Sequence, residues 1–337
     1  MNTQQQPMKK PILLIDGLNL FLRHFAVNET TNASGELVGG VLGFVKALGH
    51  LTDQFKPEVV YVVWEQGGPS PRRKAVYPEY KANRAATKQL KEIYRPDGKF
   101  IAASDTHNKL YQLQLLTKVL GELPVCQLFL QETECDDIIA YLAKRKFQNR
   151  TDTTKIIVSS DKDFYQLLED PTVRIFDPGK HLLVTAEDVQ NRFGVHVRNI
   201  TLARAVVGDP SDNLDGVSGI GFKTLLSRYP GISTGDMDLD VSWLEQASVK
   251  ALNESKKPPK CYGDMVQNLE VVKRNWRLMF LDTSCLSANQ ISKLEHKVDS
   301  FQPKCNKMSY LKVFAEAGIS VNYDIDNAFS ATKLLLR

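Results

Sequence analysis

Residues 155–164 read KIIVSSDKDF, an apolar run that ends in two serines and two aspartates. The run over residues 156–159 is short and rich in β-branched residues, which is typical of a strand buried on both faces of a parallel sheet. Asp161 and Asp163 follow at once, so we expect them just beyond the carboxyl end of that strand. Ligands of open α/β sheets bind outside those ends. The stretch therefore predicts both the fold class and the edge of the sheet at which a site lies.

Outward from this run, short apolar runs alternate with longer amphipathic stretches over the first 200 residues. We predict strands over residues 12–15, 59–64, 125–130, 156–159, 173–176 and 182–184. Helical patterns fill the intervals, reaching about residue 51 after the first strand, starting near Asp136 after the third and covering 164–168 after the fourth. This alternation favours a three-layer α/β fold, in which a mostly parallel sheet lies between two layers of helices.

The strand signals end after about residue 199. Residues 202–207 and 222–229 are predicted helices around a glycine-rich turn, and the remainder is helical apart from a break at 256–260. We therefore expect a disordered polar tail over 1–10, an α/β domain over 11–198 and a helical region over 199–337. The segment from residue 77 to about 116 is too long for an ordinary connection, so we expect it to be functional or mobile.

Composition excludes some classes of protein. The 337 residues are 42% hydrophobic and 24% charged, which is ordinary for a soluble globular protein. No run of 18 apolar residues is present, so we expect no membrane span and no membrane partner. The five cysteines are odd in number and form no C-x-x-C pair. Reduced thiols in the cytoplasm are the simplest interpretation, with neither a zinc site nor a disulfide framework.

Positive charge is concentrated in one segment. The net charge is only +4, but nine cations face three acids between residues 67 and 100. The cations are Arg72, Arg73, Lys74, Lys81, Arg84, Lys88, Lys91, Arg95 and Lys99, and the acids are Glu79, Glu92 and Asp97. A local excess of this size suits a polyanionic partner such as nucleic acid. A solvated helix face is the alternative for a charge run alone.

Carboxylates follow four of the predicted strands, and two more stand in the later turn GDPSDN. They are Asp16, Glu65, Glu134, Asp136, Asp137, Asp161, Asp163, Asp209 and Asp212. Carboxylates that gather at one edge raise one another's pKa unless a cation lies among them. Mg²⁺ and Mn²⁺ take oxygen ligands, and no histidine accompanies the set, which disfavours zinc. Two such metal ions can bind a scissile phosphate and activate water, so the set predicts phosphodiester hydrolysis.

Each acid also has a purely structural interpretation. Asp136 and Asp137 suit the first turn of a helix, and Asp161 suits a helix cap. Asp209 and Asp212 suit a turn. Acids at four separate strand ends are much harder to explain in this way, so the set carries more weight than its members.

Residues 208–224 read GDPSDNLDGVSGIGFKT, with glycines at 216, 219 and 221 and a helix start near Lys223 and Thr224. Small residues let the backbone approach a phosphate, and a helix start supplies N–H donors. Such a hairpin binds a nucleic-acid backbone without reading bases. A loop shaped only for packing is the alternative, and the spacing does not match a Walker A loop.

Five blocks of this sequence resemble, in the same order, those of the 5′ nucleases. The blocks are IDGLNLFLRHFAV (15–27), RRKAVYPEYKANR (72–84), ETECDDIIAYLAKR (132–145), VSSDKDFYQLL (158–168) and VVGDPSDNLDGVSGIGFKT (206–224). This family includes bacteriophage 5′→3′ exonucleases and ribonuclease H, and the 5′ nuclease domain of bacterial DNA polymerase I. The resemblance runs from about residue 11 to 229.

The resemblance implies a PIN-like nuclease domain and specific residue roles. All the carboxylates named above except Glu65 match the family's metal-site acids. Arg73, Lys81 and Arg84 match basic residues that approach the scissile phosphate, and Lys81 and Arg84 begin a helical arch over about residues 77–116. Gly216, Gly219, Gly221, Lys223 and Thr224 match a helix–hairpin–helix (helix–three-turn–helix) element that holds duplex DNA, with K⁺ at the hairpin.

The resemblance also implies a function. The chain would hydrolyse phosphodiester bonds at free 5′ ends, nicks or 5′ flaps of DNA and of RNA–DNA hybrids. The reaction would depend on two or more Mg²⁺ ions, with Mn²⁺ as a possible substitute. The role would be primer and flap removal in replication or repair, beside replication proteins in the cytoplasm of a bacterial or phage-infected cell. Two alternatives stay open: a DNA-binding protein without activity, which would lack the carboxylates, and a PIN-type RNA nuclease, which would lack the hairpin.

The sequence departs from the family at three positions. Glu65 stands where relatives have Asp, Cys135 where they have Ala, and Ser160 where they have Gly. Cys135 and Ser160 are small, so we expect little effect. The carboxylate of Glu65 is one methylene further from the backbone, and Mg²⁺ demands near-ideal octahedral geometry. We therefore expect Glu65 to contact a metal-bound water rather than the metal itself.

Overall fold

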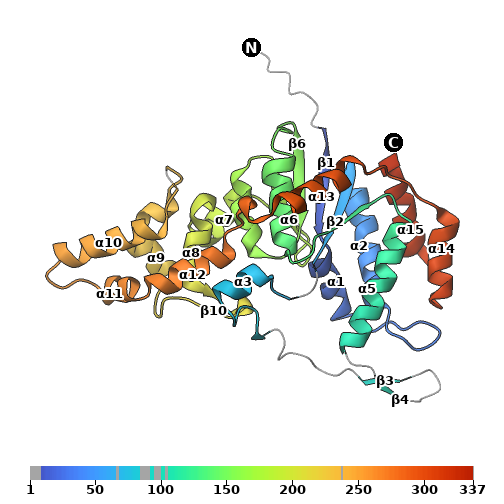
Figure 1. The fold of residues 1–337 in the computed structure, drawn as a ribbon, viewed down its shortest axis with the longest axis horizontal. Coiled ribbons are helices and arrows are strands. Elements are labelled where there is room, and N and C mark those ends of the chain that lie inside the picture. Colours follow the sequence, from blue (N-terminus) through green and yellow to red (C-terminus); the bar gives the residue numbers. More distant parts are fainter. Residues whose placement is uncertain are drawn as a thin grey trace, which may run out of the picture.

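The computed structural model describes residues 9–65, 68–83, 92–94, 100–102, 105–236 and 238–336 (Figure 1). Arg84 and most of the basic segment that follows it lie outside the described residues, as does most of the predicted N-terminal tail. No described helix is long and apolar enough to cross a membrane.

A six-stranded sheet organises the described residues, with the strand order β5-β2-β1-β6-β7-β8. The strands are β1 (Lys9–Asp16), β2 (Val59–Trp64), β5 (Cys126–Phe129), β6 (Thr153–Val158), β7 (Val173–Asp177) and β8 (Leu182–Val184). All neighbouring pairs are parallel except β7 with β8. The prediction of a mostly parallel sheet is therefore confirmed.

Alternation along the central strand separates two apolar cores. Ile12 and Leu14 of β1 belong to one core, and Leu13 and Ile15 belong to the other. All four side chains are fully buried. Successive residues of a strand point to opposite faces, so a continuous apolar run requires cover on both sides. This is why the short run ILLI specifies three layers.

One face of the sheet is covered by helices from both ends of the chain. They are α1 (Gly17–Phe25), α2 (Gly39–Phe55), α5 (Asp105–Gly121), α14 (Lys307–Glu316) and α15 (Tyr323–Thr332). The single helical pattern expected up to residue 51 is divided in two, because Thr31 and Leu37 form a β-bridge in the connection. Figure 1 shows α15, in red, beside α2, and α14 packs against α5.

The other face carries the elements that hold the predicted site. They include α6 (Cys135–Tyr141), the 3₁₀ helix η2 (Lys162–Glu169), α8 (Ile200–Val207) and α13 (Ala288–Asp299). Farther from the sheet lie α9 (Phe222–Arg228), α10 (Val241–Glu254), α11 (Lys260–Gln267) and α12 (Leu269–Met279) (Figure 1). One apolar core joins these helices to the sheet. Because this core includes residues on both sides of residue 199, the domain boundary expected there stays a prediction.

Candidate metal centre

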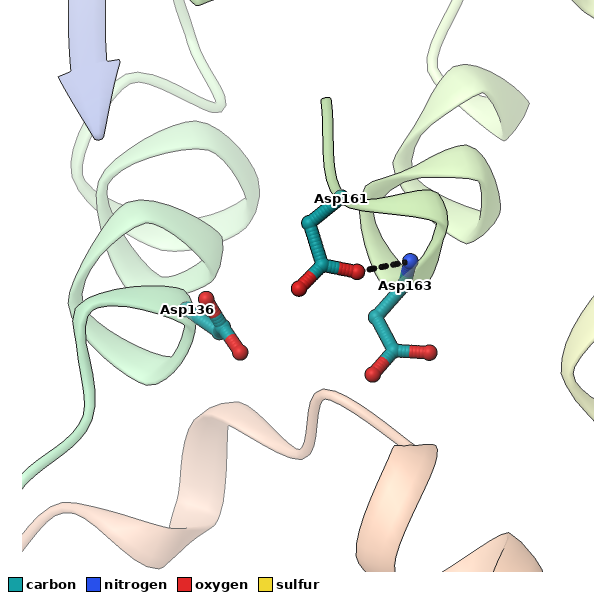
Figure 2. A group of neighbouring side chains, drawn as sticks. All are labelled: Asp136, Asp161 and Asp163. Carbon is teal, nitrogen blue, oxygen red and sulfur yellow. Dashed lines mark hydrogen bonds between the residues drawn. The ribbon is translucent and has the colours of Figure 1, made fainter. Parts of the chain in front are cut away.

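Three carboxylates meet beyond the carboxyl end of β6. Asp136, Asp161 and Asp163 each offer an oxygen, and these oxygens lie within 4.8 Å of one another. Figure 2 shows Asp136 reaching from α6 towards the two residues of the facing segment. Asp161 caps η2 by accepting a hydrogen bond of 2.8 Å from the backbone N–H of Asp163. Two separate elements, α6 and η2, therefore place carboxylates close together.

Burial raises the pKa of two of these acids. Burial, followed by the charge of Asp161, raises the pKa of Asp136 well above its ordinary value. Burial also raises the pKa of Asp163 to about 7, although Arg204 lowers it in part. A carboxylate whose pKa is raised by like charges gains most from a cation bound among its oxygens.

Asp16 stands beside this trio at the end of β1. It caps α1, accepting hydrogen bonds from the backbone N–H of Asn19 (3.0 Å) and the hydroxyl of Ser159 (3.1 Å). Burial raises its pKa to about 7, and the charges of Glu65 and Asp161 add to the shift. The turn into α1 requires glycine, because a Cβ at Gly17 would lie 2.7 Å from the ring of Trp64. Asp16 is thus a fourth acid at this edge of the sheet, and it is buried.

Glu134 and Asp137 have a different environment, because two buried cations bind them. The guanidinium of Arg73 donates to both oxygens of Asp137, at 2.8 and 3.1 Å, and lies 3.1 Å from Glu134. Its Nε donates to the carbonyl oxygen of Leu278 at 3.0 Å. Lys81 Nζ lies 2.7 Å from Glu134. Arg73 is only 1% exposed, so its donors are used inside the protein.

The pKa of Glu134 reflects this pairing. Burial alone would raise it, but Arg73 and Lys81 lower it to about 2. The backbone N–H and the hydroxyl of Ser70 donate to the same carboxylate, at 2.9 and 3.0 Å. Glu134 therefore stays charged without a metal ion, in contrast to Asp136 two residues further along the chain.

The turn with Asp209 and Asp212 holds the start of the predicted arch. The hydroxyl of Tyr80 donates to Asp212 at 3.2 Å, and the backbone N–H of Lys81 donates to the Asp212 carbonyl oxygen at 3.0 Å. Lys81 has a φ of 58°, in the left-handed region that costs free energy for a residue with a side chain. The contacts with Asp212 compensate for that strain and fix the ammonium near Glu134.

Arg204 is a functional candidate that the sequence did not reveal. From α8 its guanidinium binds Asp163, and it binds Asp209 at 2.5 Å, so it links the trio to the later turn. In the sequence it is one cation in the apolar run ITLARAVV, five residues before Asp209. That lone buried charge was the available signal, because a buried cation requires a partner.

Glu65 lies just past β2 and is half-buried. The backbone N–H of Cys135 lies 3.4 Å from its carboxylate, at the start of α6. Its charge also contributes to the raised pKa of Asp16. The side chain is therefore close to the acids at this edge of the sheet, as the strand-end pattern predicts.

The glycine hairpin combines a buried side with an open one. Gly216 packs against α8, since a Cβ there would lie 2.2 Å from the carbonyl oxygen of Val207. Gly219, which has a φ of 77°, and Gly221 are exposed, and no atom lies within 4 Å of a Cβ built on either. Lys223 is exposed and Thr224 is half-buried in the first turn of α9. The open side leaves room for a backbone to approach.

Comparison with known proteins identifies relatives over this region. Residues 11–194 match the family described as 5′-3′ exonuclease, N-terminal resolvase-like domain. The thermostable DNA polymerase I of Thermus thermophilus is 35% identical over 219 residues, which are 65% of this chain and 24% of the polymerase. A 5′-3′ exonuclease of Buchnera aphidicola is 29% identical over 230 residues, or 66% of this chain and 72% of the relative. The chain thus spans about a quarter of the polymerase.

Solved structures share the fold. The zinc-bound 5′-exonuclease of bacteriophage T5 superposes with a TM-score of 0.62, at 19% identity, covering 92% of this chain and 98% of that one. A bacteriophage T5 flap endonuclease in a complex with DNA and metal ions gives 0.60, at 18% identity, covering 91% and 97%. These likenesses confirm the expected PIN-like α/β fold. Because the family match extends over more than half of its length, the chain belongs to the 5′-3′ exonuclease family.

Proposed function

We propose that the chain is a structure-specific 5′ nuclease that hydrolyses phosphodiester bonds with two or more Mg²⁺ ions, or with Mn²⁺. The observation that carries this proposal is the convergence of Asp136, Asp161 and Asp163 within 4.8 Å. The bacteriophage T5 flap endonuclease, which has the same fold, was solved with DNA and metal ions. That likeness supports the proposal for this chain.

The donor set fits a hard divalent cation. It consists of carboxylate oxygens, which Mg²⁺ and Mn²⁺ prefer, and the pKa of Asp136 and of Asp163 is raised. Asp16 and Glu65 extend the set towards β1 and β2, with Glu65 acting through a bound water. Two ions bound in such a set would supply an activated water and stabilise the leaving oxygen.

The cations around the acids have separate tasks in this proposal. Lys81 and Arg84 would neutralise charge at the scissile phosphate. Arg73 would hold Glu134 and Asp137, and Arg204 would hold Asp163 and Asp209. The contacts of Arg73 and Arg204 would fix the acids in place before DNA binds. Charges that are positioned in advance in this way are usually the largest single contribution to catalysis.

The substrate we propose is DNA with a free 5′ end, a nick or a 5′ flap, together with RNA–DNA hybrids. Gly219, Gly221 and Lys223 would hold the backbone of the duplex away from the cut, with K⁺ at the hairpin. The resulting role is the removal of primers and flaps in replication or repair, in contact with replication proteins in the cytoplasm.

A digestion experiment tests the proposed function. Labelled 5′-flap, nicked and single-stranded DNA would be incubated with the protein in Mg²⁺ and, separately, in EDTA. We expect cleavage near the 5′ end or flap in Mg²⁺, leaving a 5′ phosphate, and none in EDTA. Cleavage in EDTA, or intact substrates in Mg²⁺, would contradict the proposal.

Lys81→Met should lower the single-turnover cleavage rate by about 10²–10³-fold, because one positive charge near the phosphate is lost. Methionine keeps most of the buried stem, so the backbone contact with Asp212 remains. DNA affinity should change much less. Lys74→Met, at an exposed position in the helix α3 (Pro71–Val76), is the control. A loss of affinity with an unchanged cleavage rate would make Lys81 an ordinary DNA contact.

Gly221→Val should weaken binding of duplex-containing DNA and spare hydrolysis of short single strands. The open space around Gly221 and its φ of −91° let a valine fit the free protein, so the change acts on the approach of DNA. Equal loss on both substrates would instead indicate a disturbed active site. Binding of the wild type should also weaken steeply with salt, since phosphate contacts release counterions.

Metal binding should depend on pH. In the folded, metal-free protein Asp16 and Asp163 have pKa values of about 7, above the ordinary 3.8. Between about pH 4 and 7, these two carboxyl groups are protonated in the folded state but ionised in the unfolded state. Their contribution to the stability of the metal-free protein therefore falls as pH rises through that range. Mg²⁺ must displace the protons. We expect the Mg²⁺-induced rise in Tm to be larger at pH 8 than at pH 5.5, and an equal rise at both would contradict this account.

A further inference from the structure

A cavity of about 570 Å³ lies between α1, α2 and the segment after β7. Its volume is within the range of small-molecule sites, roughly 300–1,000 Å³. None of the acids at the metal centre lines it. Five basic or imidazole side chains line it, namely Arg23, His24, Lys46, His50 and His181. No carboxylate is among its lining residues, and its apolar wall includes Leu20, Leu51 and Phe176.

Local structure fixes two of the imidazoles. His24 lies directly against α2, because a Cβ at Gly43 would come within 2.4 to 2.6 Å of its ring. The ring of His181 packs edge-on against Phe176, with centroids 6.4 Å apart. Within the described part of the chain, the imidazoles of His24, His50 and His181 have no hydrogen-bond partner. Three rings without a hydrogen-bond partner among the described residues thus line one cavity.

The cavity is suited to an anion that also has an apolar surface. Arg23 donates to the carbonyl oxygen of Gly179 at 3.2 Å, which holds it at the rim without neutralising its charge. Lys46 pairs with Asp324 at 3.2 Å, but both groups are partly exposed, so this pair is weak. The net charge of the lining is positive, and Leu20, Leu51 and Phe176 give it an apolar wall.

We propose that this cavity binds a nucleotide, with its phosphate near Arg23, Lys46 and the imidazoles and its base against the apolar wall. A nucleoside monophosphate combines the two properties that the lining requires. A free nucleotide and the terminal nucleotide of a strand share this chemistry. None of the acids of the metal centre lines this site. The proposal rests on the proposed nuclease function in one respect: that function is the reason for choosing a nucleotide among the possible anions.

Imidazole NMR tests the proposal directly. The chain has six histidines, of which three line the cavity. With histidine labelled and EDTA present, deoxyadenosine 5′-monophosphate should shift the resonances of His24, His50 and His181. Those of His107, His196 and His296 should stay in place. Deoxyadenosine alone, or inorganic phosphate alone, should shift these three resonances less. If a dinucleotide binds as tightly as the monophosphate, the natural ligand is the end of a strand. If the dinucleotide binds more weakly, the natural ligand is a free nucleotide. Either result supports the site.

Variants give a second readout. His50→Gln and Lys46→Met should each weaken binding of the monophosphate about tenfold, because each removes one contact with the phosphate. His296→Gln and Lys118→Met, on other exposed helix faces, should leave it unchanged. No shift at millimolar nucleotide, an equal shift with deoxyadenosine, or unchanged affinity in both cavity variants would overturn the proposal. Because the readout is binding in EDTA, failure of the proposed nuclease function would leave this test intact.

Discussion

Asp161→Asn is expected to abolish cleavage of a 5′-flap substrate, with a loss on the order of 10⁴-fold, while DNA binding stays nearly unchanged. The side-chain oxygen of asparagine can still accept the hydrogen bond from the backbone N–H of Asp163, so η2 keeps its cap. What disappears is one negative charge from a group of three acids within 4.8 Å. Divalent cations should then bind weakly, and the chemistry they supply should fail. Asp136→Asn should behave in the same way from the facing helix.

Single-turnover rates and gel-shift affinities separate the two effects. Glu169→Gln, at the far end of η2, is the matched control, because this exposed acid pairs with Arg198 rather than facing the metal centre. It should cleave at the wild-type rate. Full cleavage by Asp161→Asn in saturating Mg²⁺ would remove that residue from the metal site.

Arg73→Met should destabilise the folded protein by about 3–5 kcal/mol, the usual cost of removing one partner from a buried ion pair. Asp137 would lose both of its hydrogen bonds from Arg73, and Glu134 would lose a cation 3.1 Å away. The carbonyl oxygen of Leu278 on α12 would lose its donor as well. Three elements would be loosened at once, so urea unfolding should show a clear fall in midpoint.

Arg72→Met is the control from the next position in the chain. Its side chain is 40% exposed and lies 3.4 Å from the same Asp137, so the pair is screened by solvent. The expected loss is under about 1 kcal/mol. Equal stability of the two variants would contradict the view that Arg73 fixes the acids, and would favour direct contact of Arg73 with the scissile phosphate.

The sheet could be predicted because its information is local. The run over 59–64 and the run over 182–184 became β2 and β8 without a change of boundary. Each run carries its own burial pattern, and burial on both faces leaves few alternatives to a parallel sheet. The break between α1 and α2 was missed although residues 28–36 read NETTNASGE, a polar stretch with turn-forming residues and no apolar periodicity. Thr31 and Leu37 pair within this connection.

The separate environments of the acids could not be predicted from their positions. Asp136 and Asp137 are neighbours in the sequence, but successive residues of a helix point about 100° apart. One therefore faces Asp161, and the other faces Arg73 on a segment more than 60 residues away. Arg204 was missed for a related reason, since its partner Asp163 lies 41 residues earlier. Such contacts depend on tertiary packing, which a strand-end pattern does not contain.

A crystal grown with Mn²⁺ gives the most direct test of the metal centre. The account predicts an anomalous peak bound by oxygens of Asp136, Asp161 and Asp163, at the point where Figure 2 shows their carboxylates meeting. It also predicts that Glu65 contacts the ion through water. A saturating Mn²⁺ concentration that leaves no peak among these three aspartates, in a protein that still cleaves DNA, would contradict the account.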